Sequence, residues 1–247
     1  MKRQLSALII LIFPNVLKRI FLNMLGHRIH KKAKIGFSIV LADQLNLDEK
    51  AFIGHFNFIK VKKILIRKEG FIRHLNSIRG PLNILLRHRG TIGNSNVIKR
   101  APYPVSYGVA VLKLGVWGQI TGKHFLDCTK SISIGNYTTV AGHDSQFWTH
   151  GYYHYPTGID RFRVDGEINI GNNVYLGSRC VINAGVTIVD AVIVGSNSAV
   201  SKSLLKQGMY VNQGLRFIES DIESTLAKLK PVEGFNICER VYEKPKN

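Results

Sequence analysis

The sequence of 247 residues is poor in cysteine, in acidic residues and in long apolar runs. Its three cysteines, Cys128, Cys180 and Cys238, are odd in number and far apart. This excludes a disulfide framework and a cysteine-rich zinc module, and it favours a reducing compartment. The apolar run from Ala7 to Phe13 has seven residues, whereas about twenty are needed to cross a bilayer. No small-x-small cleavage site follows this run, so we do not expect a signal peptide.

The shortage of acidic residues is concentrated in the first hundred positions. Lys and Arg total 34 against 16 Asp and Glu, which gives a net charge of +18. Residues 1–100 hold 20 basic and 4 acidic residues (+16), and residues 101–247 hold 14 and 12 (+2). Such a field attracts phosphate on nucleic acid, anionic lipid or a cofactor, although a merely solvated basic face would have the same composition. No helix-turn-helix, zinc finger or single-strand-binding motif accompanies it, so we expect no nucleic-acid partner.

Residues 1–30 are predicted to form an amphipathic helical segment. Apolar residues recur there with helical spacing at Val16, Leu17, Ile20, Phe21, Met24 and Leu25. Lys18 and Arg19 fall off this apolar face. The face could cover the open end of the core that follows, or it could lie on an anionic membrane surface.

Apolar residues recur every six positions in two long stretches. The first comprises Ile35, Leu41, Leu47, Ile53, Ile59, Leu65 and Phe71, and the second Ile170, Leu176, Ile182, Ile188, Val194 and Val200. On a helix a step of six would scatter these residues to three sides, which excludes a helix. A strand keeps them on one face, but one flat strand of this length is far beyond the usual range. The solution is a parallel β-helix, in which each hexad is a short strand followed by a corner and three strands complete one coil.

Glycine often follows the inward residue of a hexad, at Gly36, Gly54, Gly93, Gly135, Gly171, Gly177 and Gly195. We expect glycine there to permit the backbone dihedrals of a tight corner. The predicted β-helix spans residues 31–216 and is interrupted by inserts near 101–125 and 141–167. Inserts leave a solenoid as loops on its flank, and such loops often form the binding face. Residues 217–247 are predicted to form a short helix, which begins at a capping-box sequence in 220–223, and a tail.

The segment Ile170–Ile218 resembles the C-terminal part of bacterial hexapeptide-repeat acetyltransferases, of the galactoside, maltose and capsule O-acetyltransferase type. The resemblance is carried by IGNNVYLGS, by INAGVTI and by VIVGSNSAVSK, and it is ungapped over about 49 residues. It implies a left-handed parallel β-helix that is usually trimeric and that uses acetyl-CoA as co-substrate.

In that family a histidine in a loop just before this segment acts as general base, and the corresponding residue here is His150. A neutral imidazole can take the proton of an acceptor hydroxyl, which then attacks the thioester of acetyl-CoA. His143 is the second candidate for this role. Asp144 and Asp160 are candidate partners that would orient the imidazole and stabilise its cation.

The resemblance also implies positions that contact coenzyme A along a groove between subunits. These are Tyr175, Ser178, Ser196, Ser201, Lys202 and Arg216. The small residues would let the pantetheine arm lie close to the coil, and the two cationic residues suit its phosphates. The sequence departs from the family pattern in four places: Tyr175 replaces a Trp, Val189 a corner Gly, Ser196 an Ala, and residues 212–215 the closing turn.

These observations predict an enzyme that moves an acetyl group from acetyl-CoA to a hydroxyl of a sugar or lipid-linked glycan, in surface polysaccharide biosynthesis. We expect a cytoplasmic homotrimer that needs no metal; whether its basic N-terminal part contacts the inner face of the cell membrane or caps the coil stays open. One alternative is a zinc enzyme of the hexapeptide-repeat carbonic anhydrase type, with His143, His150 and His154 as ligands. A basic membrane or nucleic-acid binding module is the other. The identity of the acceptor, and O- against N-acetylation, stay open.

Overall fold

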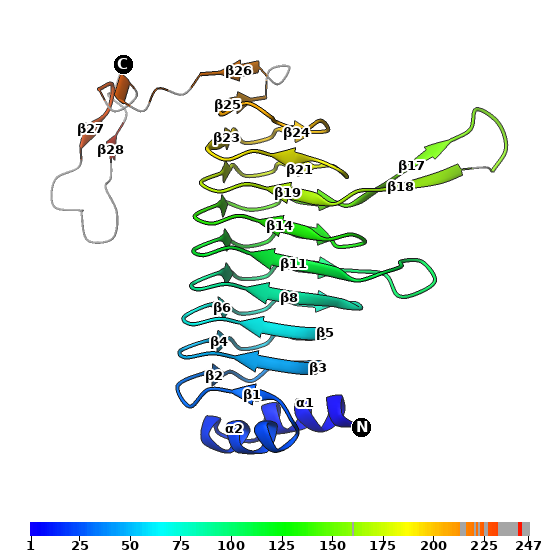
Figure 1. The fold of residues 1–247 in the computed structure, drawn as a ribbon, viewed down its shortest axis with the longest axis vertical. Helices are drawn as coiled ribbons and strands as arrows, with labels where there is room; N and C mark the ends of the chain where they lie inside the picture. Colours follow the sequence, from blue (N-terminus) through cyan, green and yellow to red (C-terminus); the bar gives the residue numbers. More distant parts are fainter. Residues whose placement is uncertain are drawn as a thin grey trace.

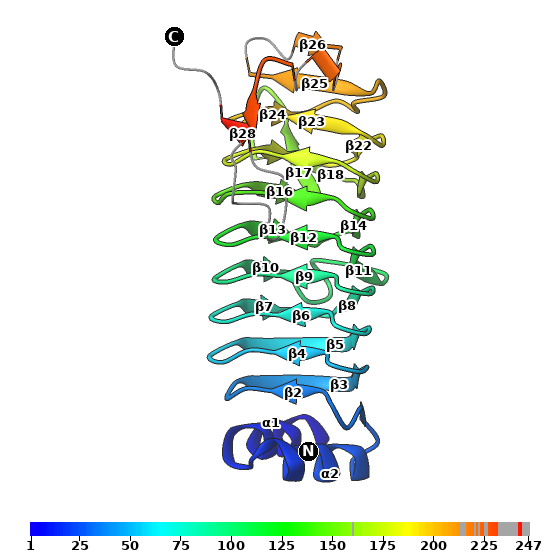
Figure 2. The ribbon, with the colours of Figure 1, turned by 90° about the vertical axis from the view of Figure 1, so that its left-hand side faces the viewer.

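The computed structural model describes residues 1–159, 161–212, 216–219, 221, 223–224, 227–231 and 242–243. Short parallel strands follow the chain around successive coils, which stack into a column with two helices at the N-terminal end (Figure 1). Figure 2, turned by 90°, shows the strands of successive coils lying above one another. The chain is therefore the parallel β-helix that the six-residue spacing predicts, and it is mainly β.

Three walls make up each coil. Wall 1 is a ten-strand sheet: β2 (Lys34–Ile35), β4 (Phe52–Ile53), β6 (Phe71–Ile72), β9 (Thr91–Ile92), β12 (Gln119–Ile120), β15 (Thr139–Val140), β20 (Tyr175–Leu176), β23 (Val192–Val194), β25 (Gly208–Val211) and β26 (Arg216–Ile218). A fourteen-strand sheet supplies the other two walls. Its strands β1 (Arg28–Ile29), β3 (Ile39–Leu47) and β5 (Phe58–Ile66) lie at the N-terminal end, and β5 bends from one wall to the other.

Beyond β5 the two walls are built from separate strands. Wall 2 contains β7 (Ser77–Arg79), β10 (Val97–Lys99), β13 (Phe125–Asp127), β16 (Gln146–Trp148), β21 (Val181–Ile182) and β24 (Ala199–Val200). Wall 3 contains β8 (Leu82–Leu86), β11 (Ala110–Leu114), β14 (Ile132–Ile134), β19 (Ile168–Ile170) and β22 (Thr187–Ile188). Inward-facing aliphatic side chains from all three walls form one continuous core.

The two hexad stretches differ in how many of their predicted inward residues are buried. All six predicted residues of 170–200 are buried. In the first stretch Leu41, Leu65 and Phe71 are only half-buried, so the prediction that they point inward is wrong. The reason is coil length, because Ile53 pairs with Ile72, nineteen residues on. The extra residue shifts the inward position away from the six-residue register.

The glycines that follow inward residues have a different role from the one predicted. A Cβ at Gly93 would lie 1.8 Å from the backbone oxygen of Thr121, and one at Gly54 would lie 2.4 Å from that of Arg73. Neither glycine has a positive φ; the left-handed corners are occupied by other residues, such as Phe56 (φ 59°) and Asn173 (φ 55°). At all of these positions except Gly195, the next coil packs too closely for a Cβ, and the expected φ requirement is wrong.

Both inserts are shorter than predicted. Strand β11 pairs in register with β8 and β14, and β12 pairs with β9 and β15. Residues 110–125 therefore belong to regular coils, and only residues 101–109 leave the column. Residues up to Trp148 also stay in the coil, and the second excursion is an antiparallel hairpin of β17 (His150–His154) and β18 (Arg161–Asp165). In the sequence, the prolines and glycines within residues 101–118 obscure the alternation of buried and half-buried residues that β11 has in the structure.

Buried polar side chains form a column along the edge between walls 1 and 2, which we call the polar edge. The side-chain oxygen of Asn57 accepts from the backbone N–H of Asn76, and that of Asn76 from the N–H of Asn96, both at 2.9 Å. Asn96 accepts in the same way from His124 at 3.0 Å, and His124 Nδ1 accepts from the N–H of Ser145 at 3.1 Å. Each side chain satisfies a buried backbone donor of the next coil, as a buried N–H requires.

Helices α1 (Lys2–Ile12) and α2 (Asn15–Met24) pack on the first coil. Ile10 and Leu22 are fully buried, and the buried Lys18 Nζ donates to the backbone oxygen of Ile35 at 2.9 Å. The helices therefore cover the open end of the core. The predicted orientation of α2 is reversed, because Lys18 points inward while most of the apolar face points outward.

The stack ends where β25 pairs with β26 in antiparallel fashion. Most of the helix predicted after residue 220 lies outside the described residues. Within them, Asp221 Oδ1 accepts from the backbone N–H groups of Glu223 and Ser224, as a helix N-cap does. Among the described residues, no helix has the length and apolar character needed to span a membrane.

Candidate active site

Two excursions leave the column at the edge between walls 2 and 3, which we call the loop edge. Residues 101–109 leave after β10, and the β17–β18 hairpin leaves after β16; both project to the same side in Figure 1. Strand β13 lies between β10 and β16 in the sheet. The ends of three neighbouring strands, one from each of three coils, therefore meet at the loop edge.

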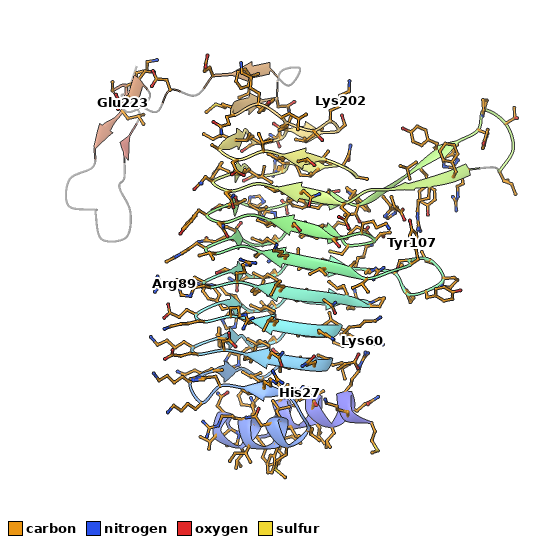
Figure 3. All side chains as sticks on the ribbon, viewed as in Figure 1. His27, Lys60, Arg89, Tyr107, Lys202 and Glu223 are labelled. Atoms are coloured by element: carbon orange, nitrogen blue, oxygen red, sulfur yellow. The ribbon has the colours of Figure 1, made fainter. Side chains whose placement is uncertain are left out.

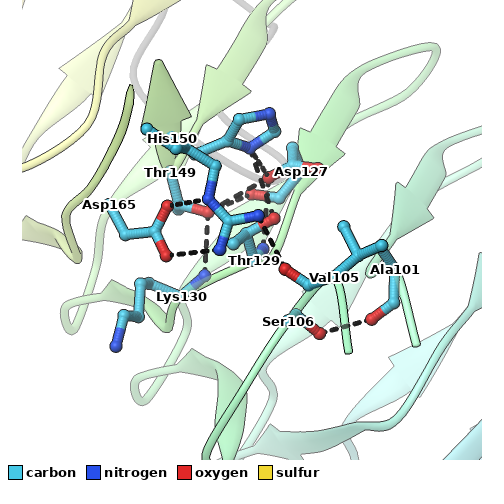
Figure 4. Close-up of polar contacts among 10 residues, drawn as sticks. Ala101, Val105, Ser106, Asp127, Thr129, Lys130, Thr149, His150 and Asp165 are labelled. Carbon is cyan, nitrogen blue, oxygen red and sulfur yellow. Dashed lines mark hydrogen bonds and ion pairs between the residues drawn. The ribbon is translucent and has the colours of Figure 1, made fainter. Parts of the chain in front are cut away.

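His150 and Asp127 face each other at this point (Figure 4). His150 begins β17, and Asp127 ends β13 one coil below. His150 Nδ1 lies 2.9 Å from Asp127 Oδ1 and 3.3 Å from the hydroxyl oxygen of Thr129. The Asp127 side chain is 7% exposed and the His150 side chain 22%. A buried carboxylate thus holds an imidazole that still reaches solvent.

Further hydrogen bonds fix the carboxylate. Asp127 Oδ1 accepts from the N–H of Thr129 at 3.1 Å and from the buried Thr149 hydroxyl at 3.2 Å. An ionised carboxylate can only accept, so in neutral His150 the hydrogen must be on Nδ1. Nε2 then carries the free lone pair. This is the arrangement of a general base that is oriented by a carboxylate.

The His150 ring opens into a cavity of about 330 Å³. Its walls include Arg79, Lys99, Arg100, Val105, Tyr152 and Arg163. Arg163 joins the two excursions, because it donates to the Val105 carbonyl at 2.6 Å and to Asp165 Oδ2 at 2.9 Å. The cavity is therefore enclosed from both sides, and most of its charged groups are cationic.

Cys128 follows Asp127 directly but takes no part in this chemistry. Its side chain is fully buried, and burial raises the pKa of the thiol far above its usual value. A thiol held in the protonated form is a poor nucleophile. Cys128 therefore does not supply a nucleophile to this site.

The structure separates His143 and Asp144 from His150. They lie between β15 and β16 at the polar edge, across wall 2 from the loop edge. His143 Nδ1 contacts Asp144 Oδ2 at 2.7 Å, and this hydrogen bond lowers the pKa of Asp144. Asp144 therefore does not orient His150 within one chain, contrary to our expectation, and Asp160 lies outside the described residues.

The residues predicted to contact coenzyme A fall on two sides of the column. Ser178 and Ser196 lie in successive coils at the polar edge, and Tyr175 is half-exposed in wall 1. Ser201 and Lys202 follow β24 and are exposed at the loop edge, on the same edge as His150. The side chain of Arg216 lies outside the described residues.

Sequence reasoning missed three functional candidates: Asp127, Thr129 and Arg163. Asp127 is 23 positions from His150, and it ends a strand whose hexad pattern is weak. The pairing of β13 with β16 brings the two residues together. The available signal was an acidic residue in an otherwise apolar strand, FLDC, because a buried carboxylate requires a partner.

The three histidines of the zinc alternative do not meet. His143 is at the polar edge, whereas His154 is exposed in the hairpin strand β17. Within the part of the chain that the structure describes, no three His, Cys, Asp or Glu residues gather as metal ligands would. The geometry of a single chain thus gives no support to a three-histidine zinc centre.

Comparison with known proteins finds similarity to acetyltransferases, although no family model matches. The chain is 54% identical over 37 residues to the galactoside O-acetyltransferase of Escherichia coli (strain K12), which is 15% of this chain and 18% of that protein. It is 35% identical over 51 residues to a chloramphenicol acetyltransferase of Morganella morganii, 21% of this chain and 24% of that protein.

Among solved structures, the polySia specific acetyltransferase NeuO aligns over 78% of this chain and 86% of its own, with 16% identity and a TM-score of 0.47. The matched segments span less than a quarter of each curated relative. The chain is thus similar to acetyltransferases over a limited part of its length.

Proposed function

We propose that the protein is an acetyltransferase that moves an acetyl group from acetyl-CoA to a hydroxyl of a sugar or glycan. One observation carries this proposal: His150 is held by Asp127 with Nε2 directed away from the carboxylate, in a cavity at the loop edge. The short but close match to the galactoside O-acetyltransferase supports acetyl transfer as the reaction.

In the proposed reaction, Nε2 of His150 accepts the proton of the acceptor hydroxyl. The oxygen attacks the thioester carbonyl, so a C–O bond forms and the C–S bond breaks. The imidazolium then gives its proton to the departing thiolate, and coenzyme A leaves as the thiol. Asp127 stabilises the transient cation through the Nδ1 hydrogen bond, which strengthens when the ring is charged.

A sugar acceptor agrees with the aromatic side chains around the cavity. Tyr152 lies edge-on to the His150 ring, with 5.8 Å between ring centroids, and Trp148 lies edge-on at 6.2 Å. Tyr103 and Tyr107 are exposed on the 101–109 loop. Rings with an apolar face and a polar rim suit the stacking and hydrogen bonding of pyranose rings. A role in surface polysaccharide biosynthesis is the setting we propose for such an acceptor.

We also propose that the enzyme acts as a trimer. Ser178 and Ser196 lie across wall 2 from His150, so on one chain these predicted coenzyme A contacts and the base belong to different edges. A neighbouring copy that brings its polar edge to the loop edge would complete the groove. Sedimentation equilibrium at micromolar concentration tests this assembly, and a monomer would contradict it.

Substitution of the base tests the proposed reaction. His150→Ala should lower turnover by about 10²–10⁴, the usual contribution of a positioned general base, with little change in affinity for acetyl-CoA. His154→Ala, in the same hairpin strand, is the matched control and should retain near-normal turnover. If His150→Ala remains fully active while His143→Ala is inactive, the base is wrongly assigned. If chelators abolish activity and zinc restores it, the mechanism itself is wrong.

The outer face of the two helices is the second surface to which we assign a role. Eight large apolar side chains are exposed there: Leu5, Leu8, Leu11, Ile12, Val16, Leu17, Ile20 and Met24. Such a patch marks an interaction site. Basic residues lie beside it: Lys2 is exposed in α1, and Arg19 of α2 donates to the backbone oxygen of the exposed Lys31 at 3.1 Å. An apolar face with a cationic rim is complementary to an anionic bilayer surface, and we propose peripheral docking there.

Pelleting with vesicles tests this docking. Ile12→Ser/Ile20→Ser should weaken binding to vesicles that contain anionic lipid, whereas Val109→Ser, at an exposed apolar residue of the 101–109 loop, should not. Added salt should weaken the binding of the native chain. Binding that ignores both salt and the double substitution would contradict the proposal. If the double substitution changed the oligomeric state and left vesicle binding unchanged, the apolar face would be a contact with a second copy of the chain.

A further inference from the structure

Cationic side chains form a ladder that leads to the His150 site. Lys60, Arg79 and Lys99 are direct partners on neighbouring strands of wall 2, and the next partner in this row is Asp127. Neighbouring strands are about 4.8 Å apart. Three exposed cations therefore rise step by step along the column and end at the carboxylate that holds the base.

The charge of this ladder is uncompensated. All four acidic residues of the first hundred positions are paired with other cations: Asp43 with Arg3, Asp48 with Arg67, Glu49 with Lys32 and Lys68, and Glu69 with Lys50 and Arg89. Among the described residues, none forms an ion pair with Lys60, Arg79 or Lys99. Figure 3 shows Lys60 on the side of the column from which Tyr107 projects, and Arg89 on the opposite side. The four carboxylates are thus taken up by six other cations, and the three cations of the ladder keep their full charge.

A groove accompanies the ladder. A cavity of about 530 Å³ lies between wall 2 and the 101–109 loop, and its lining includes Lys60, Lys62, Arg79, Tyr103 and Tyr107. Its walls share Arg79 and Arg100 with the cavity at His150. The two cavities are thus adjacent parts of one surface, with cations on the strand side and tyrosines on the loop side.

Arg100 holds this loop in place. It is buried, and it donates to the backbone oxygens of Pro81 at 2.8 Å and Tyr107 at 2.6 Å. The groove is therefore shaped by the fold rather than by the exposed lysines alone, and its tyrosines are set opposite the ladder.

We propose that the acceptor is an acidic oligosaccharide, with anionic groups on successive sugars that lie along Lys60, Arg79 and Lys99. This inference rests on the proposed acetyl transfer and names its acceptor class. The spacing of the cations is close to the length of one pyranose unit, so several charges of one chain can be met in turn. The tyrosines cover the sugar rings, and the chain reaches the base where the ladder ends. A single phosphate would leave most of this row unused.

Calorimetric binding without acetyl-CoA tests the acceptor class separately from the reaction. The probes are hexagalacturonate, maltohexaose as a neutral chain of equal length, and UDP-glucose as a phosphate source. Hexagalacturonate should bind at least tenfold more tightly than maltohexaose, with an affinity that falls as salt is added. Arg79→Gln/Lys99→Gln should weaken its binding by about 10- to 100-fold, because two charged contacts are lost. The matched control is Lys63→Gln/Lys113→Gln, which removes two strand lysines outside the groove and should bind normally.

Three outcomes would overturn the inference: equal affinity for the neutral chain, no effect of the ladder substitutions, or binding of UDP-glucose alone. His150→Ala separates this inference from the proposed function, because it should bind hexagalacturonate as the native chain does. If the acidic chain binds but no acetyl group is transferred, the acidic-acceptor inference stands and the proposed reaction is contradicted. If acetyl groups are transferred to neutral sugars only, the reaction stands and the acidic-acceptor inference is contradicted.

Discussion

The coils below the His150 site differ from those above it in repeat length and charge. Above the site the repeat is strict, since Ile170, Leu176 and Ile182 each pair with the residue eighteen positions on. Below it, Ile53 pairs with a residue nineteen positions on and Ile72 with one twenty positions on. The lower coils lie within residues 1–100, which carry +16, while residues 101–247 carry +2.

This difference separates two tasks. The upper coils contain the segment that resembles the acetyltransferases and the residues predicted to contact coenzyme A. The lower coils carry the unpaired cationic ladder. The residues at the boundary, Asp127 and His150, are where an acetyl donor from above and an acceptor from below would meet. The predictions below test this division, from the largest expected effect to the smallest.

Asp127→Asn should have the largest effect. An amide in place of the carboxylate can present its NH₂ group to Nδ1, which favours the tautomer with hydrogen on Nε2 and removes the free lone pair. Turnover should fall by about 10²–10⁴ with acetyl-CoA affinity retained. The matched control is Asp48→Asn, whose exposed carboxylate pairs with Arg67 in the lower coils and which should change turnover little. Equal losses in both variants would show that Asp127 has no special role beside His150.

Acidification should destabilise the fold before any ion pair is lost. Burial lowers the pKa of His27 and of His124 to about 4, from an ordinary value of 6.5. Each Nδ1 accepts a backbone N–H, so both rings are neutral in the folded chain. Between pH 6.5 and about 4 the unfolded chain therefore binds protons that the folded chain does not, and the free energy of unfolding decreases as pH falls.

The stability that neutral His27 and His124 contribute is fully present above pH 6.5 and is lost below about pH 4. One pKa unit corresponds to about 1.4 kcal/mol, so the two rings together account for several kcal/mol. Paired carboxylates lose their contribution only below about pH 4.5, which leaves the upper part of the window to the histidines. Urea unfolding at pH 7.5, 6.5, 5.5 and 4.5 measures the slope. His124→Gln should reduce that slope, and a flat profile in the native chain would contradict the prediction.

Gly93→Ala should break the stacking of coils. The new Cβ would lie 1.8 Å from the backbone oxygen of Thr121, and backbone cannot move aside cheaply. We expect a loss of about 3 kcal/mol in the free energy of unfolding, within the range for overpacked positions. Gly151→Ala is the control, since no atom lies within 4 Å of its Cβ position. Equal unfolding midpoints for the two variants would restore the corner explanation for glycine.

The strict repeat explains how much could be predicted from the sequence. Where eighteen residues make a coil, inward residues such as Leu176 and Ile182 keep a six-residue spacing, and the fold follows. In the lower coils one or two extra residues shift the register, so the spacing wrongly placed Leu65 inside. The polar column of Asn57, Asn76 and Asn96 was missed because its members are nineteen and twenty positions apart.

Only half of the candidate site could be proposed from the sequence, for a similar reason. The choice of His150 follows from the resemblance, because its position is fixed relative to the segment that carries the family pattern. Asp127 belongs to another coil, and only strand pairing shows that β13 lies beside β16. The orientation of α2 could not be predicted either. A lysine is expected to be exposed, but Lys18 satisfies backbone oxygens at the open end of the coil.

Lys202→Gln should have the smallest effect and should be confined to the upper part of the site. Lys202 is exposed at the loop edge above His150, where its ammonium group can meet a phosphate of coenzyme A. The dissociation constant for coenzyme A should rise about five- to tenfold, the value of one charge-assisted contact at the surface. Turnover at saturating acetyl-CoA should stay near normal, because the contact is the same in the ground state and the transition state. Lys206→Gln is the matched control, since this exposed lysine lies over the ring of Phe217 instead. If Lys202→Gln weakened acceptor binding and left coenzyme A binding unchanged, donor and acceptor would have to exchange places along the column.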